Sequence, residues 1–112
     1  MMIDPTIDEM VRKIVLTYKP DRVLLFGSYA RGTQTPFSDI DLLVVKDTAQ
    51  PRIRRGNEIR QLFYGNLLSV DLMVYTNQEL EDELMEKKSF LYSIAQSWIE
   101  VYNRAGNGSS QQ

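Results

Sequence analysis

Apolar and polar residues along the chain alternate in helical and strand-like periods. In chain order they predict a helix at 6–18, a strand at 22–26, a short helix at 28–32, a strand at 39–45, a helix at 52–63, a strand at 68–75 and a helix at 77–88. The first and last of these helices open with the spacing of a capping box, at Thr6-x-x-Glu9 and Thr76-x-x-Glu79. The first helix also has a full apolar stripe, formed by Ile7, Met10, Val11, Ile14, Val15 and Tyr18.

The C-terminal part of the chain has two interpretations. Helical spacing continues through 89–98, whereas 98–102 also has the pattern of a strand, which we favour. Residues 104–112 are rich in Gly, Ser and Gln, so we expect one domain at 1–103 followed by a flexible tail at 104–112. The order of elements predicts an α/β (α+β) fold, with a small mixed sheet, helices packed on one side and the acidic residues on the other.

The amino-acid composition excludes several kinds of catalytic and metal-binding site. The chain has no cysteine and no histidine, which excludes disulfides, thiol catalysis, imidazole catalysis and the usual zinc sites. Any metal must be bound by oxygen ligands, which favours magnesium or manganese. The net charge of −2 argues against a direct nucleic-acid binder. Neither a membrane-length apolar run nor a signal-peptide pattern is present, so we expect a cytoplasmic protein without a membrane segment.

The turn after the first strand has residues suited to binding phosphate. Gly27 and Ser28 lie where the apolar run ends and the short helix opens, so backbone N–H groups without helical acceptors are available there. Glycine lets the backbone approach a phosphate closely, and the Ser28 hydroxyl can donate to a phosphate oxygen. Taken alone, the same pair is an ordinary strand-to-helix turn with a serine cap.

Three aspartates accompany the predicted strands. Asp39 and Asp41 are two residues apart, about 6.6 Å along a strand, so both carboxylates project from one face. At this spacing they can bind one magnesium ion or two neighbouring ions. Asp71 is a lone acid inside another apolar run. Each acid taken separately could be a solvated strand residue, but the three together predict a metal site.

Several basic and aromatic residues have two interpretations. Arg31 can bind triphosphate oxygens through its guanidinium group, or it can pair with a nearby carboxylate. Tyr29 and Phe37 can stack on a base, although packing within a loop is the commoner role. The basic residues of the predicted 52–63 helix form a solvated face or, as a second choice, a partner-docking surface: Arg52, Arg54, Arg55 and Arg60.

The linked motifs resemble a known superfamily. Gly27-Ser28, ten intervening residues and Asp39-x-Asp41 are similar to the signature of the DNA polymerase beta-type nucleotidyltransferases. The longer pattern of FGSYARG, SDIDLLVV and VDLMVY resembles the minimal nucleotidyltransferase (MNT) branch over residues 7–102. The resemblance implies the polymerase beta-type nucleotidyltransferase fold. It also implies nucleotide-binding residues Gly27, Ser28 and Arg31, and catalytic, metal-binding residues Asp39, Asp41 and Asp71.

The MNT resemblance further implies an antitoxin whose partner is a HEPN-domain ribonuclease toxin. We expect transfer of AMP from ATP, with two Mg²⁺ ions, to a hydroxyl of that toxin, by resemblance a tyrosine. The 112-residue chain leaves no room for an acceptor-binding domain, so the acceptor surface would come from a partner in a homo- or hetero-oligomer. Two alternatives stay open: an antitoxin that only masks its toxin, and a transferase acting on a small molecule. The residues do not select the donor base, the acceptor residue or the number of AMP units.

Overall fold

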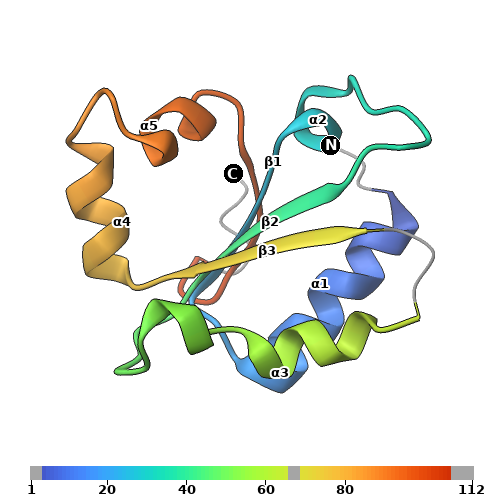
Figure 1. Cartoon of the computed structure of the whole chain (residues 1–112), viewed down its shortest axis with the longest axis horizontal. Helices are drawn as coiled ribbons and strands as arrows, with labels where there is room; N and C mark the ends of the chain where they lie inside the picture. Colours follow the sequence, from blue (N-terminus) through green and yellow to red (C-terminus); the bar gives the residue numbers. More distant parts are fainter. Residues whose placement is uncertain (1–3, 66–68, 107–112) are drawn as a thin grey trace.

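A computed structural model describes residues 4–65 and 69–106 of the chain, which form a four-stranded sheet with helices on both of its faces (Figure 1). In chain order the elements are α1 (Pro5–Tyr18), β1 (Arg22–Phe26), α2 (Ser28–Arg31), β2 (Ile40–Val45), η1 (Arg52–Arg54), α3 (Asn57–Arg60), η2 (Gln61–Phe63), β3 (Val70–Tyr75), α4 (Asn77–Leu84), α5 (Phe90–Ala95) and β4 (Ile99–Asn103). The mixed α/β class predicted from the sequence is confirmed.

Several predicted ends differ from the structure. β1 has the predicted bounds, whereas β2 begins at Ile40 and leaves Asp39 just ahead of the strand. The segment after Ser89 forms a helix and then the favoured strand β4. Leu68, the predicted start of the third strand, lies outside the described residues, and β3 begins at Val70.

The sheet is mixed, as predicted, with strand order β3-β2-β1-β4. β1 pairs antiparallel with β2 and β4, while β2 and β3 run parallel. The registers place Asp41 of β2 between two partners, Phe26 on β1 and Asp71 on β3. The two aspartates therefore lie side by side on neighbouring strands.

The prediction that helices pack on one side of the sheet is wrong. One core lies between the sheet and helices α1 and α3, with Ile14 and Ile59 fully buried in it. A second core lies on the opposite face, where Leu80 of α4 and Leu91 of α5 pack on Leu43 of β2. Both faces of the central strands are covered, so β1 and β2 are almost continuously apolar rather than alternating.

Two helix ends are set by residues that the sequence pattern did not indicate. The Asp4 side chain, not Thr6, caps α1, because its Oδ1 accepts from the Thr6 N–H at 2.7 Å and Pro5 occupies the first helical position.

The second of these helix ends is that of α4, which ends at Leu84 rather than near residue 88. Ser89 donates its hydroxyl to the Glu83 carbonyl and caps α5, which turns the chain between the two helices. The capping box predicted at Thr76 and Glu79 is confirmed.

The continuous helix predicted at 52–63 is broken at Gly56. Gly56 has φ +83°, which a helix interior cannot accommodate, and it separates η1 from α3. A Cβ at this position would lie 3.1 Å from Val74 Cγ2 and 3.2 Å from Leu72 Cδ2. The backbone at Gly56 therefore packs directly on the Val74 and Leu72 side chains of β3, at the point where the predicted helix is interrupted.

The arginines of this segment attach it to the outer edge of β3. Arg55 is only 8% exposed, and its guanidinium donates to Glu79 Oε1 at 2.6 Å and to the Val74 carbonyl at 3.4 Å. Arg60 donates to the Leu72 carbonyl at 3.0 Å. Arg52 lies over the Tyr75 ring and pairs with Glu79. A solvated face is thus the wrong interpretation for Arg55, while Arg60 is exposed but still donates to a carbonyl of β3. Both arginines occupy edge carbonyls that another strand would need.

We predict that Glu79→Gln destabilises the fold in a pH-dependent way. Chiefly through its hydrogen bond from Arg55, the pKa of Glu79 is lowered from 4.5 to about 2. Glu79 therefore contributes stability above about pH 4.5, and this contribution is lost as pH falls towards 2. Because the side chain is 30% exposed, we expect a loss of only about 1–2 kcal/mol at pH 7.

Chemical denaturation at several pH values measures the effect, with Glu81→Gln, an exposed acid on the same helix, as the control. The difference between wild type and Glu79→Gln should shrink from pH 5 to pH 3. A difference that stays constant with pH would contradict the assigned ion pair.

The end of the domain is attached to the start of β1. The Arg104 N–H donates to the Asp21 carbonyl at 2.9 Å, and the Arg104 guanidinium pairs with the Asp21 carboxylate. The flexible tail at 104–112 stays a prediction, and residues 107–112 lie outside the described residues.

Candidate active site

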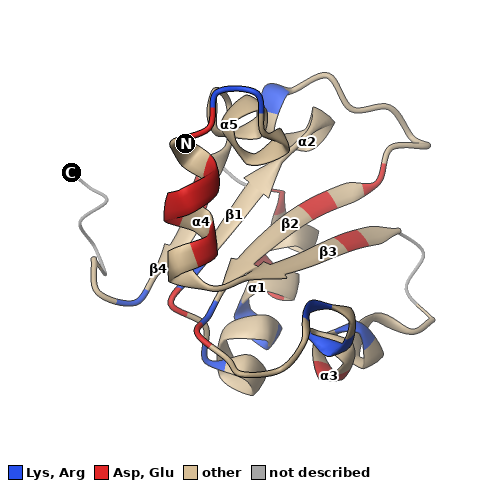
Figure 2. Cartoon of the chain, turned by 60° about the vertical axis from the view of Figure 1, so that its left-hand side comes forward, with Lys and Arg blue, Asp and Glu red and all other residues tan. Residues whose placement is uncertain are grey.

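The three aspartates gather at one end of the sheet, where β2 and β3 begin. Asp41 and Asp71 are register partners on parallel strands, which lie about 4.8 Å apart. Strand alternation puts both on the face that also carries Leu43, so α4 and α5 cover the other end of this same face. Figure 2 shows the acidic positions of β2 and β3 side by side. Asp39, just ahead of β2, is exposed near the loop from α2.

The glycine turn at the end of β1 touches this acidic group directly. Gly27 has φ +76° and ψ −155°, a backbone conformation that side-chain-bearing residues rarely adopt. A Cβ built on Gly27 would lie 2.1 Å from Oδ2 of Asp41. The Asp41 carboxylate thus occupies the space that the missing side chain leaves, and the turn and the acids form one site.

Electrostatics place Asp41 at the centre of the site. Its pKa is raised above the ordinary value of 3.8, first by burial and then by the charges of Asp71 and Asp39. The charge of Arg31 opposes this rise. Each of the three neighbours is therefore close enough to act on Asp41, and the negative charge of the site is only partly balanced.

The remaining predicted nucleotide-binding residues lie around the turn. Ser28 is the half-buried first residue of α2, and Arg31 is its exposed last residue. Tyr29 packs against the core beneath α2, which agrees with packing rather than base stacking. Phe37 is 94% exposed, on a turn where Thr35 and Ser38 hydrogen-bond to each other.

The donor set fits a hard divalent cation. The carboxylates are the metal ligands that the site offers. Asp41 is partly buried and repelled by Asp71 and Asp39, and a cation relieves that repulsion. Within residues 4–65 and 69–106, no three acidic, histidine or cysteine side chains already converge on one ion position. Magnesium commonly takes one or two carboxylates and completes its coordination with substrate phosphates, which suits such an open arrangement.

The family model described as Nucleotidyltransferase domain matches residues 8–106. The chain belongs to this nucleotidyltransferase domain family. Its match therefore includes the glycine turn, all three aspartates and every strand of the sheet.

Curated relatives of this nucleotidyltransferase domain come from Methanocaldococcus jannaschii. One protein provisionally named protein adenylyltransferase is 39% identical over 64 residues, which are 54% of this chain and 44% of the relative. Another with the same provisional name is 36% identical over 77 residues, 61% of this chain and 77% of the relative. The chain thus spans about half the length of the first relative.

Solved structures share the fold. A provisionally assigned nucleotidyltransferase from Sulfolobus solfataricus superposes with a TM-score of 0.62 at 24% identity, covering 88% of this chain and 78% of that chain. A chain from a toxin–antitoxin crystal structure with AMP-PNP superposes with a TM-score of 0.61 at 22% identity, covering 92% and 78%. At these identities the likeness is evidence of the nucleotidyltransferase fold alone.

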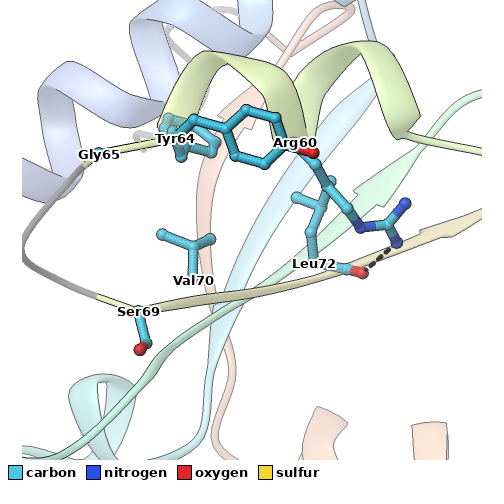
Figure 3. A pocket seen from close by; sticks show the side chains of 7 residues that line it. Arg60, Tyr64, Gly65, Ser69, Val70 and Leu72 are labelled. Carbon is cyan, nitrogen blue, oxygen red and sulfur yellow. Dashed lines mark hydrogen bonds between the residues drawn. The ribbon is translucent and has the colours of Figure 1, made fainter.

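A cavity of about 340 Å³ lies away from the acids, beside the start of β3 (Figure 3). Arg60, Tyr64 and Val70 line it, and the Arg60 guanidinium donates to the Leu72 carbonyl at its edge. Val70 and Leu72 face the α1 core, on the side of the sheet opposite to Asp71. This cavity is therefore separate from the cluster of aspartates. Among the described residues, no helix is long and apolar enough to cross a bilayer.

One residue near the site was not indicated by the sequence. Phe90, the first residue of α5, contacts Phe26, the β1 residue opposite Asp41. Phe90 follows Asp41 by almost fifty positions and belongs to no motif, so local periodicity gives no sign of this proximity. Only the packing of α5 on the acid-bearing face brings it there.

Proposed function

We propose that this domain transfers a nucleoside monophosphate from a nucleoside triphosphate to a hydroxyl group of a partner protein. The observation that carries the proposal is the contact between Gly27 and Asp41, which joins a turn suited to phosphate with a cluster of carboxylates. The family match and the provisional names of the curated relatives support the same activity.

Magnesium would be held by Asp39 and Asp41, with Asp71 as a third carboxylate beside them. We propose two ions, because the carboxylates come from two strands and do not already converge on one position. When bound, magnesium offsets the charge of the triphosphate and lowers the pKa of the attacking hydroxyl.

The residues of the chain position the reactants. The first amides of α2 and the Ser28 hydroxyl donate to the β- and γ-phosphates, and Arg31 adds a cationic contact. The acceptor oxygen forms a bond to the α-phosphorus, the bond to the bridging oxygen of the β-phosphate breaks, and pyrophosphate leaves. Asp71 takes the proton of the acceptor hydroxyl. Positioning and electrostatic stabilisation supply the rate without a covalent intermediate on this chain.

We further propose ATP as donor and a HEPN-family toxin as partner, with a tyrosine hydroxyl as acceptor. Support comes from the MNT-like motifs and from a structural neighbour that belongs to a toxin–antitoxin structure with AMP-PNP. The partner would supply the acceptor surface in a hetero-oligomer. We also propose the cytoplasm as the place of this reaction.

Calorimetry of ATP binding tests the metal site. Wild type should bind ATP clearly better with magnesium than without it, because the three carboxylates repel a bare triphosphate. Asp41→Asn should reduce the gain that magnesium gives. Tight ATP binding that needs no magnesium and is unchanged in Asp41→Asn would remove the proposed function.

A further inference from the structure

An aromatic ring is held next to the acidic site by an edge-to-face contact. The ring centroids of Phe26 and Phe90 are 5.9 Å apart, with an angle of 81° between the ring planes. Phe26 is 6% exposed, while Phe90 remains 50% exposed. Such a contact engages one part of the Phe90 ring and leaves the rest open to solvent.

The register relates this ring to the reacting groups. Phe26 is directly opposite Asp41 on the neighbouring strand and directly precedes Gly27 in the chain. Register partners on one sheet face have Cβ atoms about 5 Å apart, so the Phe26 ring and the Asp41 carboxylate are neighbours. Phe90 contacts the Phe26 ring from α5, the helix that packs on this same face through Leu91.

Packing of α5 does not explain why a phenylalanine is exposed here. Leu91 is fully buried and Ile94 packs beside it, so these two residues attach α5 to the sheet. Ser89 caps the helix, accepting from the Tyr92 N–H at 3.0 Å. Contact with Phe26 accounts for the buried part of the Phe90 ring, whereas the exposed part is left over as an aromatic stacking surface.

We propose that the exposed part of the Phe90 ring stacks on the base of the bound nucleotide. The inference rests on the proposed function: with the phosphates at Gly27 and Ser28, the nucleoside can extend over Asp41 towards α5. Stacking uses a surface that every base has, so Phe90 would add affinity without selecting adenine. It would act as a positioning residue that aligns the α-phosphate with the acids.

Two substitutions separate stacking from a structural role. Phe90→Leu keeps apolar bulk against Phe26 but removes the aromatic surface, whereas Phe90→Tyr keeps the ring. Calorimetry compares magnesium-ATP with magnesium-tripolyphosphate, which lacks the nucleoside. Phe90→Leu should weaken ATP binding roughly 5- to 150-fold and leave tripolyphosphate binding unchanged. Phe90→Tyr should bind both like wild type.

The control is Phe37→Ala, which removes a 94% exposed ring from the turn that precedes Asp39. It should bind both ligands like wild type. The stacking role is wrong if Phe90→Leu binds ATP like wild type, or if it weakens ATP binding and tripolyphosphate binding equally. It is also wrong if Phe37→Ala loses ATP affinity, since the base would then contact that turn. Failure of the proposed metal and phosphate site is distinguishable, because wild type would then bind neither ligand with magnesium. Failure of transfer itself is distinguishable, because it would leave the binding of both ligands unchanged.

Discussion

Replacing Asp41 with asparagine should abolish nucleotidyl transfer and leave the domain at least as stable as wild type. The substitution removes a carboxylate that we place at the metal and phosphates, so transfer should fall by about 10²- to 10³-fold or more. The raised pKa of Asp41 means that its charged form is unfavourable in the folded protein. Removing the charge should therefore increase stability at pH 7, a gain that disappears as pH falls through the ordinary range of a carboxyl group.

The measurements are transfer rate and denaturant midpoint in the absence of metal, with Asp8→Asn as the control. Asp8 is an exposed acid in the first turn of α1, on the opposite side of the sheet. Its replacement should leave the transfer rate unchanged. A clear loss of stability in Asp41→Asn would show that this carboxylate makes favourable contacts in the metal-free fold, contrary to the electrostatics described above.

Gly27→Ala should impair both folding and transfer, and Gly32→Ala separates the two causes. Both glycines have positive φ, +76° and +75°, so an alanine at either is strained by about 1–3 kcal/mol. The strain is larger at Gly27, because its ψ of −155° belongs to a region that is essentially restricted to glycine, whereas Gly32 is in the left-handed helical region. Only the Cβ at position 27 meets Asp41, whereas nothing lies within 4 Å of a Cβ at position 32. Gly27→Ala should therefore lose more stability and nearly all transfer, while Gly32→Ala should retain most of its activity.

Thermal melting and single-turnover transfer measure this pair. Each kcal/mol corresponds to a shift of about 4–8 °C in the melting temperature of a domain of this size. Adding Asp41→Ala should relieve part of the extra destabilisation in Gly27→Ala, because the clashing carboxylate is gone. Equal losses of transfer in Gly27→Ala and Gly32→Ala would mean that the contact with Asp41 has no special role.

The pattern of apolar and polar residues correctly predicted the strands and helices whose ends depend on neighbouring residues in the chain. The apolar run at 22–26 fixes a buried strand, and the glycine that follows ends it, so β1 and α2 have nearly the predicted bounds. In β2 the alternation puts Leu42 and Val44 on the face opposite Asp41, whereas Asp39 lies ahead of the strand, so its predicted place on the same face as Asp41 stays a prediction. The same pattern placed Asp71 in a strand, but only the parallel pairing of β2 and β3 makes the two acids neighbours.

Features that depend on tertiary contacts were not predictable from one sequence. The helical spacing at 52–63 gave no sign that Gly56 packs on β3 and breaks the helix. The arginines of that segment seemed solvated, because their acceptors are backbone carbonyls of β3. Periodicity also shows that a helix has an apolar face, but it does not show which side of the sheet that face covers. For this reason the predicted arrangement, with all helices on one side of the sheet, was wrong.

The most direct test of the transferase proposal uses ATP labelled at the α-phosphate and the partner protein. The partner is the proposed HEPN-family toxin. Wild type should transfer the α-label to that partner and increase its intact mass by whole nucleoside monophosphate units. The double variant Asp39→Asn/Asp41→Asn should still bind the partner, because docking covers a wider surface than the acids, but should transfer no label. If the double variant protects cells from the toxin as well as wild type, with no mass change in either case, the protein is a mask and the transferase account is contradicted.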